Sequence, residues 1–436
     1  MDFIDLFVEY NKMRTYSPEM YSRHLSYQLI GHSMGWKSFN KSYPPKGAIH
    51  NMYVALLGKS GKTKKTTTQY DIIGDLYPSG YRGPANFSPE GLLQLLGGRE
   101  AIGGNNPKPA IAPRPQMICT LGEFSIILRS IKNGGNMGNF KEIANDLFTR
   151  KDAYDKQLVE KVYHVDYPYL SLSTTCTEEE FFGNLTPDMV HGGFLPRWLL
   201  VYSEPPVRRK IELPSDIDTV EYEMKSIVKI LYEIFKKREQ LFVFDEGADK
   251  LMYEIQCELE DDGKWENVQP FVSRYMSYIV KYADILCISE KLAGLTHLTE
   301  LTQLTSLSSL TSVIYDIRVK LASLLTNVSC GNSVNSVNSE HINRSKSLIL
   351  PCLEYARKVV SYVDEEHDLA TVLRVIDGKQ EIDRSSLLQR SHLSSVKLDI
   401  VLRTLLERGE YEQVLVDVGK GKHKTVIRKC GGIVNE

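Results

Sequence analysis

The spacing of apolar residues changes character several times along the chain. Residues 1–45 carry apolar side chains at helical spacing, among them Phe3, Ile4 and Phe7, and predict an N-terminal helical segment. From residue 46 to residue 212, short apolar runs of strand length alternate with helical patterns. The expected strands cover residues 53–57, 116–121, 167–175 and 198–202. Because this alternation is typical of parallel sheets with helices on both faces, we predict an α/β core with a mainly parallel sheet over 46–212.

Residues 213–365 have a helical pattern, with Ile227, Ile230 and Leu231 on one helix face, and predict a helical domain. Within it, a Leu-Thr-x triplet repeats over 295–312, and an Asn-Ser-Val triplet repeats over 332–339. A period of three matches neither the two-residue period of a strand nor the 3.6-residue period of a helix. We therefore interpret about 293–339 as a low-complexity insertion.

The last segment, 366–436, has a compact pattern of its own. Three helices are expected near 369–376, 384–389 and 395–408, and two strands near 411–418 and 424–428. A Gly-Lys-Gly-Lys turn separates the two strands. Because three helices followed by a β-hairpin are typical of a winged helix, we predict a C-terminal winged-helix domain over 366–436.

Charge and cysteine content narrow the function classes. The formal net charge is -2, so the chain as a whole is not a polybasic nucleic-acid coat, and any contact with DNA would come from a local patch. The seven cysteines form no Cys-x-x-Cys pair. This pattern indicates separate free thiols in a protein of a reducing compartment. No apolar run is long enough to span a bilayer, so we expect a cytoplasmic protein with no membrane partner.

A glycine- and lysine-rich run at 58–67 lies between an expected strand and an expected helix. At such a turn glycines let the backbone approach a phosphate, and a lysine followed by a hydroxyl completes the cradle. The candidate ligands of ATP are Gly58, Ser60, Gly61, Lys62, Thr63, Lys64, Lys65, Thr66 and Thr67. The strict phosphate-loop signature has glycines where this chain has Lys59 and Lys64. The residues alone therefore leave a second interpretation open, a basic and exposed strand-to-helix turn.

Five sequence blocks, taken in order, carry a resemblance to a known family. The first is 60–67, which matches the pattern S-G-x-x-R-K-[S/T]-T with lysine in place of arginine, and the others are 88–92, 123–125, 168–175 and 192–198. Over roughly 1–365, less the insertion, the chain resembles the RecA/AAA-like P-loop ATPases of unknown function from phages, plasmids and integrated elements, which are associated with primases and helicases. The resemblance implies a RecA-like core, ATP and Mg²⁺ as cofactors, and assembly into a ring.

The resemblance also suggests roles for individual residues. Lys65 would neutralise the β- and γ-phosphates of ATP, and Thr66 would bind Mg²⁺. Glu123, at the end of an expected strand, would activate the attacking water or hold the water shell of the metal. The family usually has Asp-Glu at this place, and Gly122 replaces the aspartate here. ATP binding is therefore expected whether or not hydrolysis is retained.

Two further candidates follow in the chain. Thr175 ends an expected strand, where its hydroxyl would sense the γ-phosphate, and the alternative is that it caps the next helix. Arg197 lies in an apolar setting and therefore needs an anionic partner. We interpret it as an arginine finger or sensor of the same or a neighbouring subunit, and the alternative is a structural ion pair.

The C-terminal domain carries the candidate DNA contacts. We expect the start of its third helix to face a DNA groove and the basic turn of its hairpin to contact phosphates. The residues concerned are Ser394, Ser395, Lys397, Lys420, Lys422 and Lys424. The alternative is a winged helix that packs against another protein.

Taken together, these patterns predict an NTP-dependent DNA-processing ATPase, a helicase- or primase-associated replication protein of a mobile genetic element. Its expected partners are DNA, a primase or other replication proteins, and further copies of itself in a ring. The alternative function is a nucleotide-responsive, catalytically weak DNA-binding initiator or regulator, which Gly122 and the altered phosphate loop favour.

Overall fold

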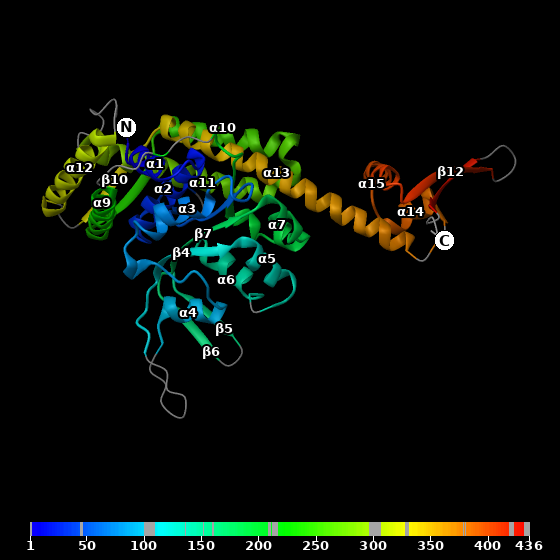
Figure 1. Ribbon diagram of the computed structural model, residues 1–436, viewed down its shortest axis with the longest axis horizontal. Helices are drawn as coiled ribbons and strands as arrows, with labels where there is room; N and C mark the ends of the chain where they lie inside the picture. Colours follow the sequence, from blue (N-terminus) through cyan, green and yellow to red (C-terminus); the bar gives the residue numbers. More distant parts are fainter. Residues whose placement is uncertain are drawn as a thin grey trace, which may run out of the picture. The chain divides into compact units, whose positions relative to one another are not determined.

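The computed structural model of the chain describes residues 2–43, 47–99, 110–135, 137–150, 152–158, 161–207, 211, 217–295, 307–327, 331–377, 379, 381–417 and 423–430. The chain divides into two units, Met1–Arg357 and Lys358–Glu436, whose helices and strands are drawn in Figure 1. The boundary between the units falls inside the long helix α13 (Ser339–Ile376). It therefore lies a little before residue 366, where we predicted the start of the C-terminal domain.

The centre of the first unit is a four-stranded parallel sheet. Its strands are β3 (Tyr53–Leu57), β4 (Gln116–Glu123), β7 (Tyr169–Cys176) and β8 (Trp198–Tyr202), and their order across the sheet is β4-β7-β3-β8. Every residue of β3 and of β7 is buried, as expected for central strands of a sheet covered on both faces. The predicted α/β class with a parallel sheet is confirmed.

Helices that are far apart in the sequence pack on this sheet. The predicted N-terminal helical segment contains α1 (Phe3–Arg14) and α2 (Glu19–Met34), and α2 contacts β3, β7 and β8. Most polar side chains of α2 are also buried, and Gln28 donates hydrogen bonds to the carbonyls of Met52, just before β3, and of Leu172 on β7. Helix α11 (Gln269–Leu295) packs against α1 and α2, and the Tyr278 hydroxyl bonds to the backbone at the start of β3. These side chains satisfy backbone groups that the sheet leaves unpaired.

Shorter elements connect and flank the sheet. Further helices of the first unit are α3 (Lys65–Gln69), the π-helical turn η1 (Tyr70–Gly74), η2 (Ser79–Tyr81), α4 (Pro89–Gly97), α5 (Phe124–Lys132), α6 (Phe140–Leu147), α7 (Glu178–Gly183), α8 (Pro187–His191), η3 (Leu195–Arg197), α9 (Ile217–Lys237), α10 (Glu246–Asp261), η4 (Gly263–Val268) and α12 (Leu307–Asn327). Strands β5 (Tyr154–Leu158) and β6 (Lys161–Val165) form an antiparallel hairpin. Among the residues that the structure describes, no helix has the length and apolar character needed to cross a membrane.

Part of the predicted low-complexity insertion is a strand of a second sheet. This sheet has the order β10-β9-β1-β2 and consists of β1 (Phe39–Asn40), β2 (Ala48–Ile49), β9 (Arg238–Phe244) and β10 (Gly331–Val337). All seven residues of β10 pair in parallel with β9. The interpretation of 293–339 as an insertion is therefore wrong for β10. Since an edge strand is positioned by backbone bonds to a strand distant in sequence, its repetitive composition did not indicate it.

Helix α12 also lies within the predicted insertion. It packs against α9 and buries Val313, Ile314, Ile317 and Leu321, which follow helical spacing once the Leu-Thr-x repeat has ended. Most of the repeat itself, at 296–306, lies outside the described residues. The predicted helical domain at 213–365 thus contains both helices and two strands of the second sheet.

Replacing Asn335 with alanine is expected to destabilise the first unit by about 1–3 kcal/mol. Asn335 is 3% exposed, and its amide donates to the Gln240 side chain (3.1 Å) and to the Leu241 carbonyl (3.3 Å) on β9. Alanine would leave these buried acceptors without that donor. The measurement is urea unfolding, with Val334→Ala as the control because Val334 is 65% exposed on the same strand. Equal losses of stability in the two variants would contradict an integral β10.

The second unit combines the end of α13 with an antiparallel sheet. Its elements are β11 (Glu381–Asp383), α14 (Arg384–Ser391), α15 (Ser395–Glu407), β12 (Tyr411–Asp417) and β13 (His423–Lys429), with the strand order β11-β13-β12. A separate core is formed by Leu369, Val372, Ile376, Ile382, Leu387, Leu398, Val401, Leu402, Leu405, Tyr411 and Ile427. The structure therefore contains the three helices and the hairpin expected from the sequence, and it adds the short strand β11.

Candidate functional site

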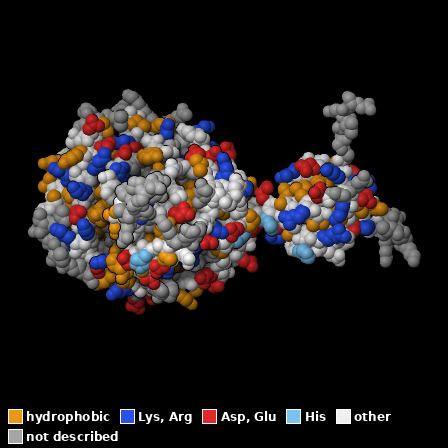
Figure 2. Space-filling model, turned by 90° about the horizontal axis from the view of Figure 1, so that it is seen from below, with side chains coloured by type: hydrophobic (Ala, Val, Ile, Leu, Met, Phe, Trp, Pro, Cys, Tyr) orange, Lys and Arg blue, Asp and Glu red, His pale blue; other side chains and the backbone are white. Residues whose placement is uncertain are grey.

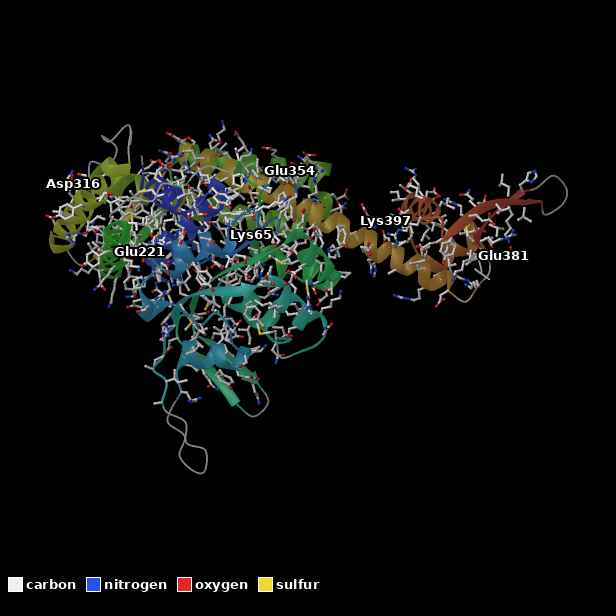
Figure 3. The ribbon with its side chains drawn as sticks, in the orientation of Figure 1. Lys65, Glu221, Asp316, Glu354, Glu381 and Lys397 are labelled. Atoms are coloured by element: carbon white, nitrogen blue, oxygen red, sulfur yellow. The ribbon has the colours of Figure 1, made fainter. Side chains whose placement is uncertain are left out.

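The predicted phosphate loop lies at the carboxyl edge of the parallel sheet, where Figure 3 labels Lys65. Strand β3 ends at Leu57, the loop covers residues 58–64, and α3 begins at Lys65 and continues into η1. The apolar run stops at Gly58, and the following segment has no proline to interrupt a helix. Since ligands of open α/β sheets bind outside the carboxyl ends of the strands, the loop is in the expected place for a ligand.

The backbone of the loop explains which of its residues must be small. A Cβ atom on Gly58 would lie 2.6 Å from the Tyr21 hydroxyl, so a larger residue is excluded there. Gly61 and Lys64 have left-handed φ angles of 66° and 53°. In this conformation a lysine costs roughly 1–2 kcal/mol more than a glycine. The strict signature has glycine at position 64, so the loop keeps the conformation that this glycine favours although the residue is lysine.

Lys65 points its amine into the mouth of the loop. The Nζ atom donates to the carbonyls of Gly58 (2.8 Å) and Lys59 (3.3 Å) and to the Thr63 hydroxyl (3.3 Å), and the residue is 8% exposed. Burial lowers the pKa of Lys65, while the thiol of Cys176 and the carboxylate of Glu123 raise it. Among the described residues, no carboxylate lies within ion-pair distance of this amine. The amine is therefore a buried cation surrounded by neutral oxygens, and an anion would stabilise it.

Three other predicted residues lie at the same edge of the sheet. The hydroxyls of Thr66 and Thr175 are 3.3 Å apart. Glu123 ends β4 directly opposite Thr175 of β7, after a bulge in the pairing of these strands. Its carboxylate is exposed and does not cap α5. The neighbouring Thr174 donates to the carbonyl of Gly122 at 2.7 Å and holds the two strand ends together. The structure thus brings Thr66, Thr175 and Glu123 to the loop.

The other loop residues have different surroundings. Thr63 is fully buried and donates to the Lys59 carbonyl at 3.1 Å. The Lys64 amine lies 5.3 Å from the centre of the Tyr16 ring. Ser60, Gly61, Lys62 and Thr67 are exposed. These exposed side chains would contribute less to a phosphate contact than the buried amine of Lys65. The backbone N–H groups of the same residues remain candidate ligands of the phosphate.

Arg197 is not at this edge of the sheet. It precedes Trp198, the first residue of β8, and Trp198 pairs with Tyr53 at the start of β3, whereas the loop follows the end of β3. The length of the strand, roughly 16 Å, separates the two edges. The Arg197 guanidinium donates to the Gly193 carbonyl at 2.5 Å. Because residues that precede parallel strands lie at the amino edge, a finger role for Arg197 would require the loop of a neighbouring subunit, which is one of the two arrangements expected from the sequence.

Three residues beside the loop were not predicted. The Tyr21 hydroxyl of α2 donates to the carbonyl of Leu57 at 2.5 Å, and no local pattern connects a helix so far upstream to the loop. Glu204 forms an ion pair with Lys59 at 3.1 Å, between two exposed side chains. Cys176 is buried next to Thr175. The rule that selects residues at the ends of neighbouring parallel strands would have found Cys176 and Glu204.

In the second unit, the described candidates for DNA contact are all engaged within the unit. Ser394 caps α15, and Ser395 accepts a hydrogen bond from Arg384 at 2.7 Å. Lys397 lies 3.0 Å from the Asp368 carboxylate, and Lys424 lies 3.3 Å from that of Asp383. Lys420 and Lys422 lie outside the described residues. In the free protein, Lys397 and Lys424 are therefore both paired with carboxylates of the same unit.

The surface of the second unit is mixed in character. On the face seen in Figure 2, Lys and Arg side chains lie among acidic and apolar ones. Val396 and Ile400, one turn apart on α15, are 70% and 49% exposed. The helix expected to face a groove thus presents apolar as well as basic groups.

No protein-family model matches the chain, and no curated protein matches it.

Proposed function

We propose that the first unit is a RecA/AAA-like P-loop core that binds ATP and Mg²⁺ and hydrolyses ATP. The observation that supports this best is the cluster at the carboxyl edge, where the buried amine of Lys65 lies beside Thr66, Thr175 and Glu123. The amine has no carboxylate partner among the described residues, and the loop retains a left-handed residue directly before it. A phosphate group would supply the missing negative charge.

The strand order supports the same proposal. Thr175 of β7 is paired with Leu56 of β3 on one side and with Glu123 of β4 on the other. Since neighbouring strands are about 4.8 Å apart, the Glu123 backbone is roughly 10 Å from the strand that carries the loop. This spacing leaves room for a phosphate on the loop and a water molecule between that phosphate and the carboxylate.

Each residue would then have a defined role. Lys65 would exchange its bonds to neutral loop oxygens for bonds to the β- and γ-phosphates. The Thr66 hydroxyl and the Glu123 carboxylate are the groups that would hold Mg²⁺, directly or through water, and the metal would neutralise charge that develops on the phosphates. Glu123 would accept the proton of the attacking water, and Thr175 would donate a hydrogen bond to the transferred phosphate.

A second candidate function is a nucleotide-responsive, catalytically weak DNA-binding initiator or regulator. Gly122 favours this candidate. The family that the chain resembles usually has Asp-Glu at this strand end, whereas this chain has Gly122 and the single carboxylate of Glu123. Steady-state phosphate release, with and without single-stranded DNA, separates the candidates. The ATPase core predicts release that single-stranded DNA stimulates, whereas the regulator predicts ATP binding with no release above background.

We further propose that the second unit is a winged helix that binds DNA through its hairpin. The support is the arrangement of α14, α15 and the β12–β13 hairpin on a separate core, with the sequence Gly-Lys-Gly-Lys between the two strands. The ion pairs of Lys397 and Lys424 would have to open for these lysines to contact DNA phosphates. The apolar Val396 and Ile400 support the alternative of a protein partner such as a primase.

Replacing Lys420, Lys422 and Lys424 with alanine is expected to weaken binding of duplex DNA by residues 358–436, for all sequences alike. Three lost phosphate contacts would reduce the slope of log K against log salt by roughly three units, and by less if the pair of Lys424 with Asp383 persists. The measurement is fluorescence anisotropy across a salt series. Arg374→Ala, an exposed change on α13, is the control. Equal binding by triple variant and control would show that the hairpin turn contacts no DNA.

The proposal of a primase, other replication proteins and further copies of the chain as partners rests on the resemblance to the P-loop ATPase family. A helicase- or primase-associated replication protein would act as a ring, and Arg197 at the amino edge would reach a bound nucleotide only from a neighbouring subunit. Sedimentation of the full chain with and without ATP tests this part of the proposal, since a monomer in both conditions contradicts the ring.

A further inference from the structure

A pocket separate from the phosphate loop lies at the amino edge of the parallel sheet. Its volume is about 540 Å³, and it is lined by the end of α2 and the residues after it, the start of β4 and the end of α9. The lining residues include Met34, Trp36, Lys37, Gln116, Phe235 and Lys236. Pockets of roughly 300–1,000 Å³ are typical of small-molecule sites, so this volume is large enough for one nucleotide unit.

A stacked pair of aromatic rings adjoins the pocket. Trp36 of the lining stacks on Tyr167, with the ring centres 4.2 Å apart and the ring planes 9° from parallel. Tyr167 lies in the connection between β6 and β7 and is 44% exposed. Because Trp36 covers one face of the Tyr167 ring, the exposed part includes the opposite face. An exposed ring face is a surface on which a planar aromatic group can stack.

The backbone at Tyr167 has an unfavourable conformation. Its φ is 47°, and among the described residues Lys64 and His392 are the other non-glycine residues with a positive φ. The next residue is Pro168, and the residue before a proline is normally extended. Since a bulky residue in this conformation is strained, its presence points to a role for the ring that it holds in place.

Lysine side chains lie beside the aromatic pair. The Lys37 amine is 5.5 Å from the centre of the Trp36 ring and 3.3 Å from the Glu239 carboxylate. Lys236 and Lys237 line the same pocket and are exposed. Among the described lining residues, Glu239 is the single acid beside these three lysines. The lysines complement the carboxyl ends of α2 and α9, and their exposed ammonium groups can also contact phosphates.

We propose that this pocket binds single-stranded nucleic acid. A base stacks on the outer face of Tyr167 and extends the Trp36–Tyr167 stack, while the adjacent phosphates contact Lys37 and Lys236. The faces of bases in a duplex are already covered by their neighbours, so this surface selects single strands. The inference rests on the proposed DNA-processing function for its ligand, but none of its residues belongs to the phosphate loop or to the second unit.

The test is the tryptophan fluorescence of the full chain during titration with a short single-stranded oligothymidylate. The chain has three tryptophans, and Trp198 and Trp265 are 0% and 4% exposed, whereas Trp36 is half-buried. A ligand therefore changes chiefly the emission of Trp36. Residues 358–436 contain no tryptophan, so DNA bound to the hairpin of the second unit gives no direct signal. We expect saturable quenching by the single strand and unchanged emission with the same strand in a duplex.

Tyr167→Ala is expected to weaken the binding of the oligothymidylate roughly 10- to 100-fold, as for the loss of one base–aromatic stack. Tyr167→Phe keeps the ring and should bind as the wild type does. Tyr253→Ala is the matched control, since Tyr253 is 70% exposed on α10 and does not line this pocket.

Lys236→Ala serves as a second variant, which decides if Tyr167→Ala lowers the melting temperature. The loss of one phosphate contact is expected to reduce the slope of log K against log salt by about 0.7, the value for single strands. Lys229→Ala, an exposed lysine elsewhere on α9, is its control and should leave the slope unchanged.

The outcomes separate this proposal from that of the ATPase. Lys65→Ala should retain the quenching, because the phosphate loop lies at the other edge of the sheet. The proposal is overturned if the oligothymidylate leaves the emission unchanged, if thymidine monophosphate or the duplex binds as tightly, or if Lys65→Ala abolishes the quenching. It is also overturned if Tyr167→Ala and Lys236→Ala both bind like their controls. None of these results bears on whether the loop binds ATP, which titration with ATP decides.

Discussion

Replacing Lys65 with alanine is expected to abolish ATP binding, with a loss of affinity of roughly 100-fold or more. The amine of Lys65 lies 2.8 Å from the Gly58 carbonyl and is the buried cation at the mouth of the loop. Without it, the negative charge of the phosphates would face the carbonyls of Gly58 and Lys59 with no compensation. The measurement is titration with a fluorescent ATP analogue, together with the melting temperature of the variant.

Two neighbouring lysines provide matched controls for this variant. Lys62 is exposed, and Lys59 is exposed and paired with Glu204, so Lys62→Ala and Lys59→Ala should only weaken ATP binding. All three changes remove one positive charge from the same loop. If Lys65→Ala bound ATP as tightly as the wild type, the loop would be the basic strand-to-helix turn that the residues alone left open, and the ATPase proposal would fail with it.

The parallel sheet could be predicted because two of its strands, β3 and β8, are continuous apolar runs. Tyr53–Leu57 and Trp198–Tyr202 are short, buried and bounded by turn residues, which is a local property of the sequence. The clustering of Thr66, Thr175 and Glu123 also followed from a simple rule, since the carboxyl ends of parallel strands meet at one edge. Local pattern and sheet geometry are sufficient for this part of the site.

Other features depend on contacts that no local pattern records. Lys64 departs from the strict signature, yet its φ of 53° preserves the path of the loop, and backbone conformation is not visible in the residue name. Strand β10 was missed because its position depends on β9, and Asn335 is buried there by bonds to Gln240 and Leu241. The apolar surroundings of Arg197 left open whether it serves its own subunit or a neighbouring one, although its place before β8 already puts it at the amino edge.

Replacing Glu123 with glutamine is expected to leave ATP binding intact and to reduce steady-state phosphate release by about 10²- to 10⁴-fold. The amide has nearly the shape of the carboxylate but cannot accept a proton from the attacking water. Because Glu123 is exposed at the strand end and caps no helix, the change should not affect folding. Affinity for ATP is expected to be equal or higher, since a negative charge next to the γ-phosphate is removed.

The matched control is Glu179→Gln, the same chemical change at an exposed position in the first turn of α7, which follows β7. It should leave both binding and phosphate release unchanged. Nucleotide titration and phosphate release are measured on each variant and compared with Lys65→Ala, which is expected to lose both activities. Unchanged release in Glu123→Gln would place the catalytic base elsewhere. Absence of release in the wild type, with ATP bound, would instead favour the nucleotide-responsive regulator, in which Glu123 is the one carboxylate of the pair Gly122-Glu123.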